Sequence, residues 1–245
     1  MYNKGKGSIV LDIHKYITYH YTFLFPDKSA KEFIVTLDTS TLHVVQPVRL
    51  NYPEWMKLKF NQCPRCSLDT SKNEYCPIAI SLYDPIECFR HHKSFEPLEV
   101  SISTKERRYI HQTTLQKGLS SLIGIFMVTS GCPAMEKLKP MVRFHLPFAT
   151  EEETKYRALS MYLLSQFFVS RHGGNPDWEM KGLVGLYEDI RMINRSFTGR
   201  LIGTTTEDAS INAVVILDCF ADSIAFSITE DLLEEIEKLF SVYLK

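Results

Sequence analysis

The sequence has little excess charge and lacks a long apolar run free of charged residues. Its 28 Lys and Arg residues balance 29 Asp and Glu residues, which argues against a general electrostatic hold on nucleic acid. The most apolar run, residues 211–228, contains Asp218 and Asp222, which would be costly in a bilayer. The apolar stretch Ile9–Leu11 is too short for the core of a signal peptide. We therefore expect a cytoplasmic protein that neither enters a membrane nor binds nucleic acid generally.

The chain also lacks the short motifs that mark several large enzyme classes. It contains no Walker phosphate-binding loop, no Gly-x-Gly-x-x-Gly, no Gly-x-Ser-x-Gly and no His-Glu-x-x-His. Each of these motifs places backbone amides, a nucleophile or paired metal ligands where the chemistry needs them. Their absence favours a non-enzymatic binding or adaptor protein.

No internal repeat, low-complexity segment or Gly/Ser-rich linker divides the 245 residues. The residue pattern nevertheless changes near residue 110, from strand-like alternation to helical spacing. We expect a β-rich region with a Cys-rich loop at residues 1–110 and a helical region at residues 111–245, packed against each other. Residues 1–12, in which Lys and Gly alternate at residues 4–7, are expected to form a loose end.

Aromatic and β-branched residues predict strands in the first region. Residues 16–25 and 32–37 flank the turn sequence Pro26-Asp27-Lys28-Ser29, and this arrangement predicts a hairpin. Further short strands are expected at residues 42–45, 78–82 and 99–103.

Apolar residues three or four positions apart predict helices in the second region. Thr150 and Glu153 form a capping-box sequence at one helix start, and Gly131 ends the helix before it. Five helices are expected, at residues 114–131, 150–170, 177–201, 208–226 and 229–243. Strands and helices together predict an α+β fold, with a small antiparallel β-sheet in the N-terminal half and a roughly five-helix C-terminal half.

The helix expected at residues 177–201 has near-heptad apolar spacing. Such spacing is typical either of an intramolecular core or of a seam between two copies. The spacing is therefore compatible with a protein partner or a homodimer.

Cysteines are the most informative residues of the chain. Cys63, Cys66 and Cys76 surround a short polar loop, and Cys132 lies in a similar Cys-Pro setting after a helix end. A Cys-x-x-Cys turn aims two sulfurs at one point, and zinc takes four such ligands in a tetrahedron. The loop has too few apolar residues to form a core, so a metal would supply the ordering energy. We expect these four cysteines to hold one structural zinc.

Alternatives to this zinc site remain open. Cys88, His91 and His92 compete with Cys132 for the fourth ligand position because they are close to the loop in sequence. Cys219 lies in an apolar helix and is expected in the core. The cysteines could also be free thiols, or Cys63 and Cys66 could form a redox pair, although no helix is expected to begin there to lower the thiol pKa.

Arg143 and His145 precede one long helix, and His172 ends it. For Arg143 and His145, a polar contact between the two regions is favoured over catalysis. For His172, a cation at the helix C-terminus is favoured.

The segments CPRC, YCP, GCPAM and RFHLPFA together resemble a set of uncharacterised bacterial proteins classed as a domain of unknown function. The resemblance covers most of the chain and implies no activity. The leading hypothesis is therefore a cytoplasmic binding or adaptor protein with a structural zinc. The alternative is an enzyme, either a thiol-redox catalyst that uses Cys63 and Cys66 or a metal-dependent hydrolase.

Overall fold

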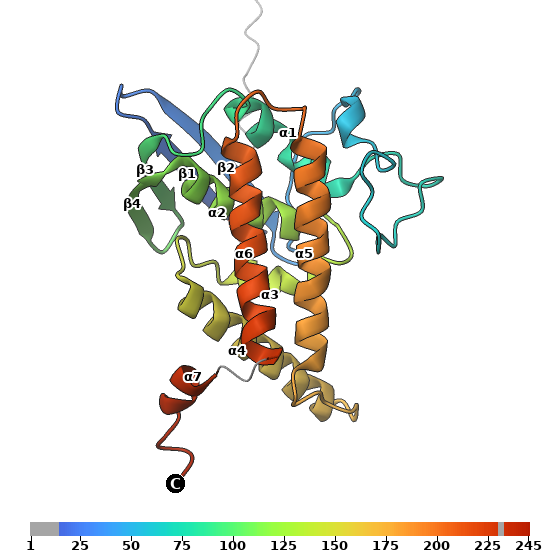
Figure 1. Cartoon of the computed structure of the whole chain (residues 1–245), viewed down its shortest axis with the longest axis vertical. Helices are drawn as coiled ribbons and strands as arrows, with labels where there is room; N and C mark the ends of the chain where they lie inside the picture. The colour runs from blue at the N-terminus through green and yellow to red at the C-terminus, as the bar shows by residue number, and fades with distance from the viewer. Residues whose placement is uncertain (1–14, 230–232) are drawn as a thin grey trace, which may run out of the picture.

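A computed structural model describes residues 15–229 and 233–245 and has an α+β fold (Figure 1). The loose end expected at residues 1–12 lies outside the described residues. Four strands form one antiparallel sheet in the order β2-β1-β3-β4. They are β1 (Tyr16–Leu24), β2 (Ala30–Asp38), β3 (Pro97–Ser103) and β4 (Arg108–Thr114). The expected hairpin and the strand at residues 99–103 are confirmed.

Alternation along β1 explains which face of the sheet is buried. Tyr19, Tyr21 and Phe23 point to one face, because successive side chains of a strand point to opposite faces, and all three are buried. The partner strand places Val35 and Leu37 on the same face, where both are fully buried. Burial of this face fixes the register of the hairpin.

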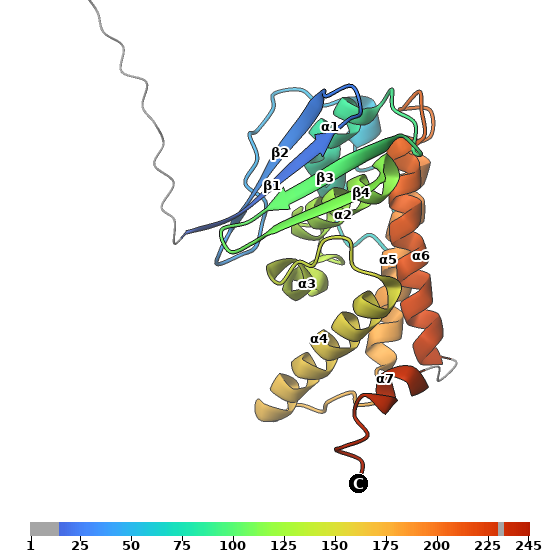
Figure 2. The same ribbon diagram turned by 90° about the vertical axis from the view of Figure 1, so that its left-hand side faces the viewer.

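The sheet and the first two α-helices form two hairpin–helix units. The hairpin β1–β2 leads to α1 (Pro77–Phe89), and the hairpin β3–β4 leads to α2 (Leu115–Thr129). The first strands of the two hairpins, β1 and β3, pair at the centre of the sheet. Figure 2 shows both helices on the same side of the sheet, toward α5 and α6. The first unit differs by a long insertion between β2 and α1, which carries the Cys-rich loop.

The structure differs from the expected strands at three places. Residues 78–82 lie in α1 and not in a strand, since Pro77 occupies the first helical turn and the following apolar run is long enough for a helix. Residues 42–45 form only an isolated bridge, between Val44 and Leu37. Strand β4 was not expected from the sequence, because its residues are mostly polar and exposed at the edge of the sheet.

The C-terminal half is helical, as expected. The capping box is present: Glu153 N–H donates to Thr150 Oγ1 at 3.1 Å, and Thr150 N–H donates to Glu153 Oε2 at 2.8 Å. The described helices here are α2 and α3 (Lys139–Arg143), α4 (Glu151–Arg171), α5 (Lys181–Leu201), α6 (Ala209–Thr229) and α7 (Glu234–Lys238). The last is far shorter than the helix expected at residues 229–243, of which residues 230–232 lie outside the described part.

One hydrophobic core joins the sheet to the helices. Its central element is α2, which packs against the sheet on one side and against α6 on the other. The core takes in residues on both sides of residue 110, so the two regions pack together. The division into residues 1–110 and 111–245 itself stays a prediction.

Within the described residues, α6 alone is long and apolar enough to cross a membrane. A core helix of a folded domain passes the same test. In this structure α6 packs against α5 and α2, and Asp218 lies 3.2 Å from Arg195 Nε of α5. Figure 1 shows α5 and α6 side by side along most of their length.

Candidate functional site

The Cys-rich loop is closed at its base and folded tightly at its first thiols. Lys57 and Tyr75 form an antiparallel bridge, and Cys76 N–H donates to Met56 O at 2.9 Å. Cys66 N–H donates to Cys63 O at 3.0 Å, which closes the expected Cys-x-x-Cys turn. The loop therefore holds Cys63 and Cys66 on one turn and Cys76 at the loop base.

Cys76 and Cys132 each lie beside backbone amides that act on the thiol pKa. Cys76 is the N-cap of α1: burial raises the pKa of its thiol, whereas the Arg200 cation and the amides of Ala79 and Ile78 act in the opposite direction. Cys132 follows Gly131, whose left-handed backbone (φ 88°) ends α2 as expected. The amides of Met135 and Ala134 act against burial on the pKa of Cys132 in the same way. Backbone amides near a sulfur favour the thiolate over the thiol.

The four thiols come from three segments and lie close enough to interact electrostatically. Burial raises the pKa of Cys63, and the neighbouring Cys76 and Cys66 thiols raise it further. Burial also raises the pKa of Cys132 to about 11, with smaller contributions from Cys76 and Cys63. A cavity of about 50 Å³ is lined by Cys63, Cys66 and Cys132 and is bounded by α5. Loop, α1 and the segment after α2 thus meet at one place.

The four sulfurs are not arranged as the ligands of a metal ion in this structure. Across residues 15–229 and 233–245, no group of three or more His, Cys, Asp or Glu side chains has the arrangement that holds a metal ion. Zinc–sulfur distances are about 2.3 Å, so zinc binding would require the sulfurs to turn toward a common point.

A buried cation lies against this thiol cluster. Arg200 of α5 is 2% exposed, and its guanidinium donates to the carbonyl oxygens of Trp55, Lys57 and Leu58 at 2.7–3.1 Å. Burial lowers the pKa of Arg200, whereas the nearby Cys76, Cys63 and Cys66 thiols act in the opposite direction. In the described part of the chain, no carboxylate forms an ion pair with this guanidinium. The positive charge is therefore buried without an acidic partner.

Two further contacts dock the loop on α5. Arg65 forms an ion pair with Asp189 at 2.8 Å, and Asn61 Nδ2 donates to Gly199 O at 2.8 Å. The sequence does not indicate α5 as the surface beneath the loop, because these partners are more than 120 residues apart. An isolated Arg in an otherwise apolar stripe of a helix is the signal that could have indicated Arg200.

The rival fourth ligands lie in other surroundings. Charged groups near Cys88 are Lys31 and Asp84, and the other thiols are not among them. His91 Nδ1 lies 2.7 Å from Thr206 Oγ1, and His92 Nδ1 lies 2.9 Å from Glu96 Oε2. Cys132 is therefore the residue that the structure brings to the loop thiols.

The expectation that Cys219 lies in the core is wrong. Its side chain is exposed on α6, because this helix is apolar on more sides than it buries. The residue has no part in the thiol cluster.

His145 forms a polar cluster that joins the two regions, as the sequence predicted. Its Nε2 lies 2.9 Å from Tyr21 Oη and 3.3 Å from Ser121 Oγ. Burial, with a smaller contribution from the Arg157 cation, lowers the pKa of His145 to about 3. Neither the cavity beside the thiols nor the one between α4 and α7 reaches these side chains. The cluster thus acts as a structural link between β1, α2 and the segment before α4.

His172 also lies where the sequence placed it, at the C-terminus of α4. Its Nδ1 lies 2.8 Å from the carbonyl oxygen of Phe168. A histidine in this position satisfies one of the last helical carbonyls when Nδ1 carries the proton.

Fold and site together define an α+β protein whose thiol cluster lies between its front loop and its helical half. Residues 17–241 match the model of a family described as Domain of unknown function (DUF6901), and the chain belongs to that family. This match confirms the resemblance to an uncharacterised family. Comparisons with curated proteins and with solved structures found no match.

Proposed function

We propose that Cys63, Cys66, Cys76 and Cys132 hold one structural zinc ion. The chain is then a non-enzymatic binding or adaptor protein whose loop, α1 and the end of α2 are fastened together by the metal. A reducing cytoplasm would keep the thiols available for zinc. Each segment contributes at least one sulfur, so the metal would join parts of the chain that are distant in sequence.

The buried Arg200 is the observation that carries this proposal. A buried charge without a counter-charge is costly, and proteins rarely retain one. Zinc bound by four thiolates has a net charge of about −2, by simple addition of the charges of the ion and its ligands. Such a centre beside Arg200 would supply the missing negative charge and lower the cost of burying the guanidinium.

The backbone around the thiols supports the same proposal. Amides near Cys76 and Cys132 act against burial and favour the ionised sulfurs that zinc requires. The cavity of about 50 Å³ beside the loop leaves room for a single ion once the sulfurs turn inward. Rotation about the Cα–Cβ bond of a cysteine between staggered states is sufficient for such a turn.

The same surroundings argue against the redox alternative. A reactive thiol needs a lowered pKa, usually from a helix N-terminus or a nearby cation. Burial outweighs the nearby Arg200 cation and raises the pKa of Cys63, and no described helix begins at the Cys-x-x-Cys turn. Four protein ligands would also close the metal site, whereas a hydrolytic zinc keeps one position open for water.

Metal analysis of the purified protein tests the proposal. We expect one zinc per chain, lost on Cys63→Ser or Cys132→Ser and retained in the matched variant Cys88→Ser. Cobalt substituted for zinc should show the absorption of tetrahedral thiolate coordination. Less than half an equivalent of zinc, with all thiols freely titratable in the folded protein, would overturn it.

A further inference from the structure

The second half of α4 exposes large apolar side chains that the other described residues cover only in part. Leu163, Leu164, Phe167 and Phe168 are each between 37% and 55% exposed. Figure 2 shows this end of α4 projecting away from α5 and α6. Contiguous apolar patches of this kind mark sites of association in soluble proteins.

One face of α4 carries these residues in a self-complementary order. Residues three or four positions apart lie on the same face of a helix, and they form one stripe here. The stripe begins with an acid, ends with a base and has a small residue near its centre. In order it comprises Glu153, Tyr156, Ser160, Leu163, Phe167 and Arg171, all of them exposed.

We propose that α4 pairs antiparallel with α4 of a second copy of this chain. A two-fold axis near the middle of the stripe places Glu153 opposite Arg171 of the other copy. By the same symmetry, Tyr156 faces Phe167, and Ser160 faces Leu163. Each pairing occurs twice, because an isologous interface uses the same patch on both subunits. Opposite charges then meet at both ends, and large side chains meet small or aromatic ones between them.

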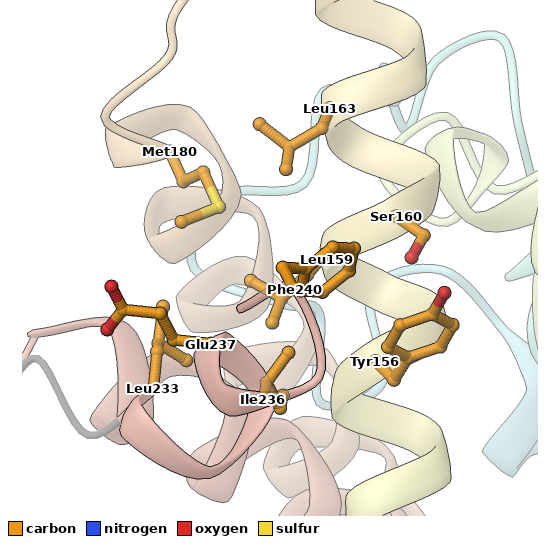
Figure 3. Close-up of a pocket in the computed structure, with 9 residues that line it drawn as sticks. All are labelled: Tyr156, Leu159, Ser160, Leu163, Met180, Leu233, Ile236, Glu237 and Phe240. Carbon is orange, nitrogen blue, oxygen red and sulfur yellow. The ribbon is translucent and has the colours of Figure 1, made fainter. Parts of the chain in front are cut away.

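A cavity along the first half of the stripe fits this arrangement. It has a volume of about 310 Å³ and lies between α4 and α7, lined by Tyr156, Ser160 and Leu163 of the stripe and by Ile236 and Phe240 of the C-terminal segment, among others (Figure 3). Phe167 of the second copy would lie opposite Tyr156, at the mouth of this cavity. None of the residues of α7 is buried in the single chain, and the cavity volume is large enough for one aromatic ring.

Charge distinguishes a second copy from a membrane as the occupant of this face. Helices that lie on membranes carry Lys and Arg beside their apolar face. Beside this face α7 instead carries Glu234, Glu235 and Glu237, and α4 begins with three glutamates. The apolar stripe of α5, for which the sequence also allowed a seam between two copies, is buried within the single chain.

The proposed dimer rests on the proposed function in one respect: it makes a second copy of the chain the partner of a binding protein. It does not depend on zinc, because the α4 face and the thiol cluster are formed by different elements. Mass and zinc content measured on the same sample therefore separate the two proposals. A zinc-containing monomer contradicts dimer formation alone, and a zinc-free dimer contradicts zinc binding alone.

Sedimentation equilibrium of the full chain tests the pairing. We expect the wild-type protein to have twice the monomer mass at micromolar concentration. Phe167→Glu should raise the dimer dissociation constant at least about tenfold, since a central aromatic contributes strongly to an interface. The matched control Ile34→Glu, on the exposed face of β2, should leave the mass unchanged. Circular dichroism should show both variants folded.

Charge reversal gives the sharper result. Arg171→Glu should weaken the dimer, and adding Glu153→Arg to the same chain should restore it, because the opposite charges would again face each other. A wild-type monomer at tens of micromolar overturns the proposal, whether or not it binds lipid vesicles. A dimer that tolerates Phe167→Glu, or a double variant weaker than Arg171→Glu alone, also overturns it.

Discussion

Tyr21 Oη lies 2.9 Å from His145 Nε2, and this contact joins the second half of the chain to the central strand of the sheet across 124 residues. Ser121 of α2 completes the cluster at 3.1 Å from Tyr21 Oη. Burial raises the pKa of Tyr21 and lowers that of His145, so both groups stay neutral over the physiological range. The cluster is therefore a link between elements that is insensitive to pH near neutrality.

At acid pH the same link should weaken. The pKa of His145 is about 3 in the folded chain against the ordinary 6.5, so only the unfolded chain takes up this proton as the pH falls below 6.5. The stabilising contribution is complete above pH 6.5 and is lost as the pH approaches 3. We expect a loss on the order of 3 kcal/mol.

Urea unfolding at several pH values checks this expectation. His145→Gln should be less stable than the wild type at pH 7 and should lose less stability between pH 6.5 and 4. The control is His20→Gln, whose exposed side chain lies on the outer face of the sheet, and it should keep the wild-type slope. Equal slopes for wild type and His145→Gln would contradict the assignment.

Arg200→Met should strongly destabilise the fold. The substitution keeps much of the apolar volume but leaves the carbonyl oxygens of Trp55, Lys57 and Leu58 without their donors. An unsatisfied buried carbonyl costs about 1–3 kcal/mol, so we expect a total loss of about 2–5 kcal/mol. Arg195→Met on the same helix removes an ion pair with Asp218 in which the Arg side chain is exposed, and should cost under about 1 kcal/mol. Equal stability of the two variants in urea unfolding would show that Arg200 is not a structural anchor.

Removal of zinc should lower the melting temperature. A ligand that binds only the folded chain stabilises it by mass action, and tight zinc binding contributes on the order of 3 kcal/mol or more. For a chain of this length we expect a strong chelator to lower the melting temperature by roughly 6–12 °C. Cys88→Ser should respond like the wild type, whereas Cys132→Ser should melt at the same temperature with and without chelator. An unchanged melting temperature of the wild type in the presence of the chelator would contradict a structural metal.

Two helical glycines should respond in opposite ways to alanine. A Cβ at Gly118 of α2 would lie 2.5 Å from Val100 Cγ2 of the sheet, so Gly118→Ala should destabilise the fold by about 1–3 kcal/mol. A Cβ at Gly185 of α5 would meet no atom within 4 Å, so Gly185→Ala should stabilise it by up to about 1 kcal/mol. Thermal unfolding of both variants measures the difference. Destabilisation of similar size at both positions would contradict the close approach of α2 to the sheet.

Features that depend on neighbouring residues were predictable from the sequence. The capping box at Thr150 and the helix end at Gly131 are local, and both are present. The hairpin β1–β2 follows from alternation and a turn, and the Cys63–Cys66 turn follows from its spacing.

Features that depend on distant partners were not predictable. Residues 78–82 are apolar without a clear period, so only their packing against α2 decides that they form part of a helix. The polar strand β4 exists because it extends the edge of a sheet begun elsewhere. For the thiol cluster, the cysteines could be named in advance, but the buried cation beside them could not. Arg200 meets its carbonyl partners only after the whole chain has folded.

The separation between Arg200 and the segment that it holds has a consequence for synthesis of the protein. Trp55 leaves the ribosome 145 residues before the side chain that binds its carbonyl oxygen. During that interval the thiols of the loop have no α5 against which to settle, and they stay open to oxidation or to stray metals. The nascent chain would therefore depend on a reducing environment until α5 has emerged from the ribosome.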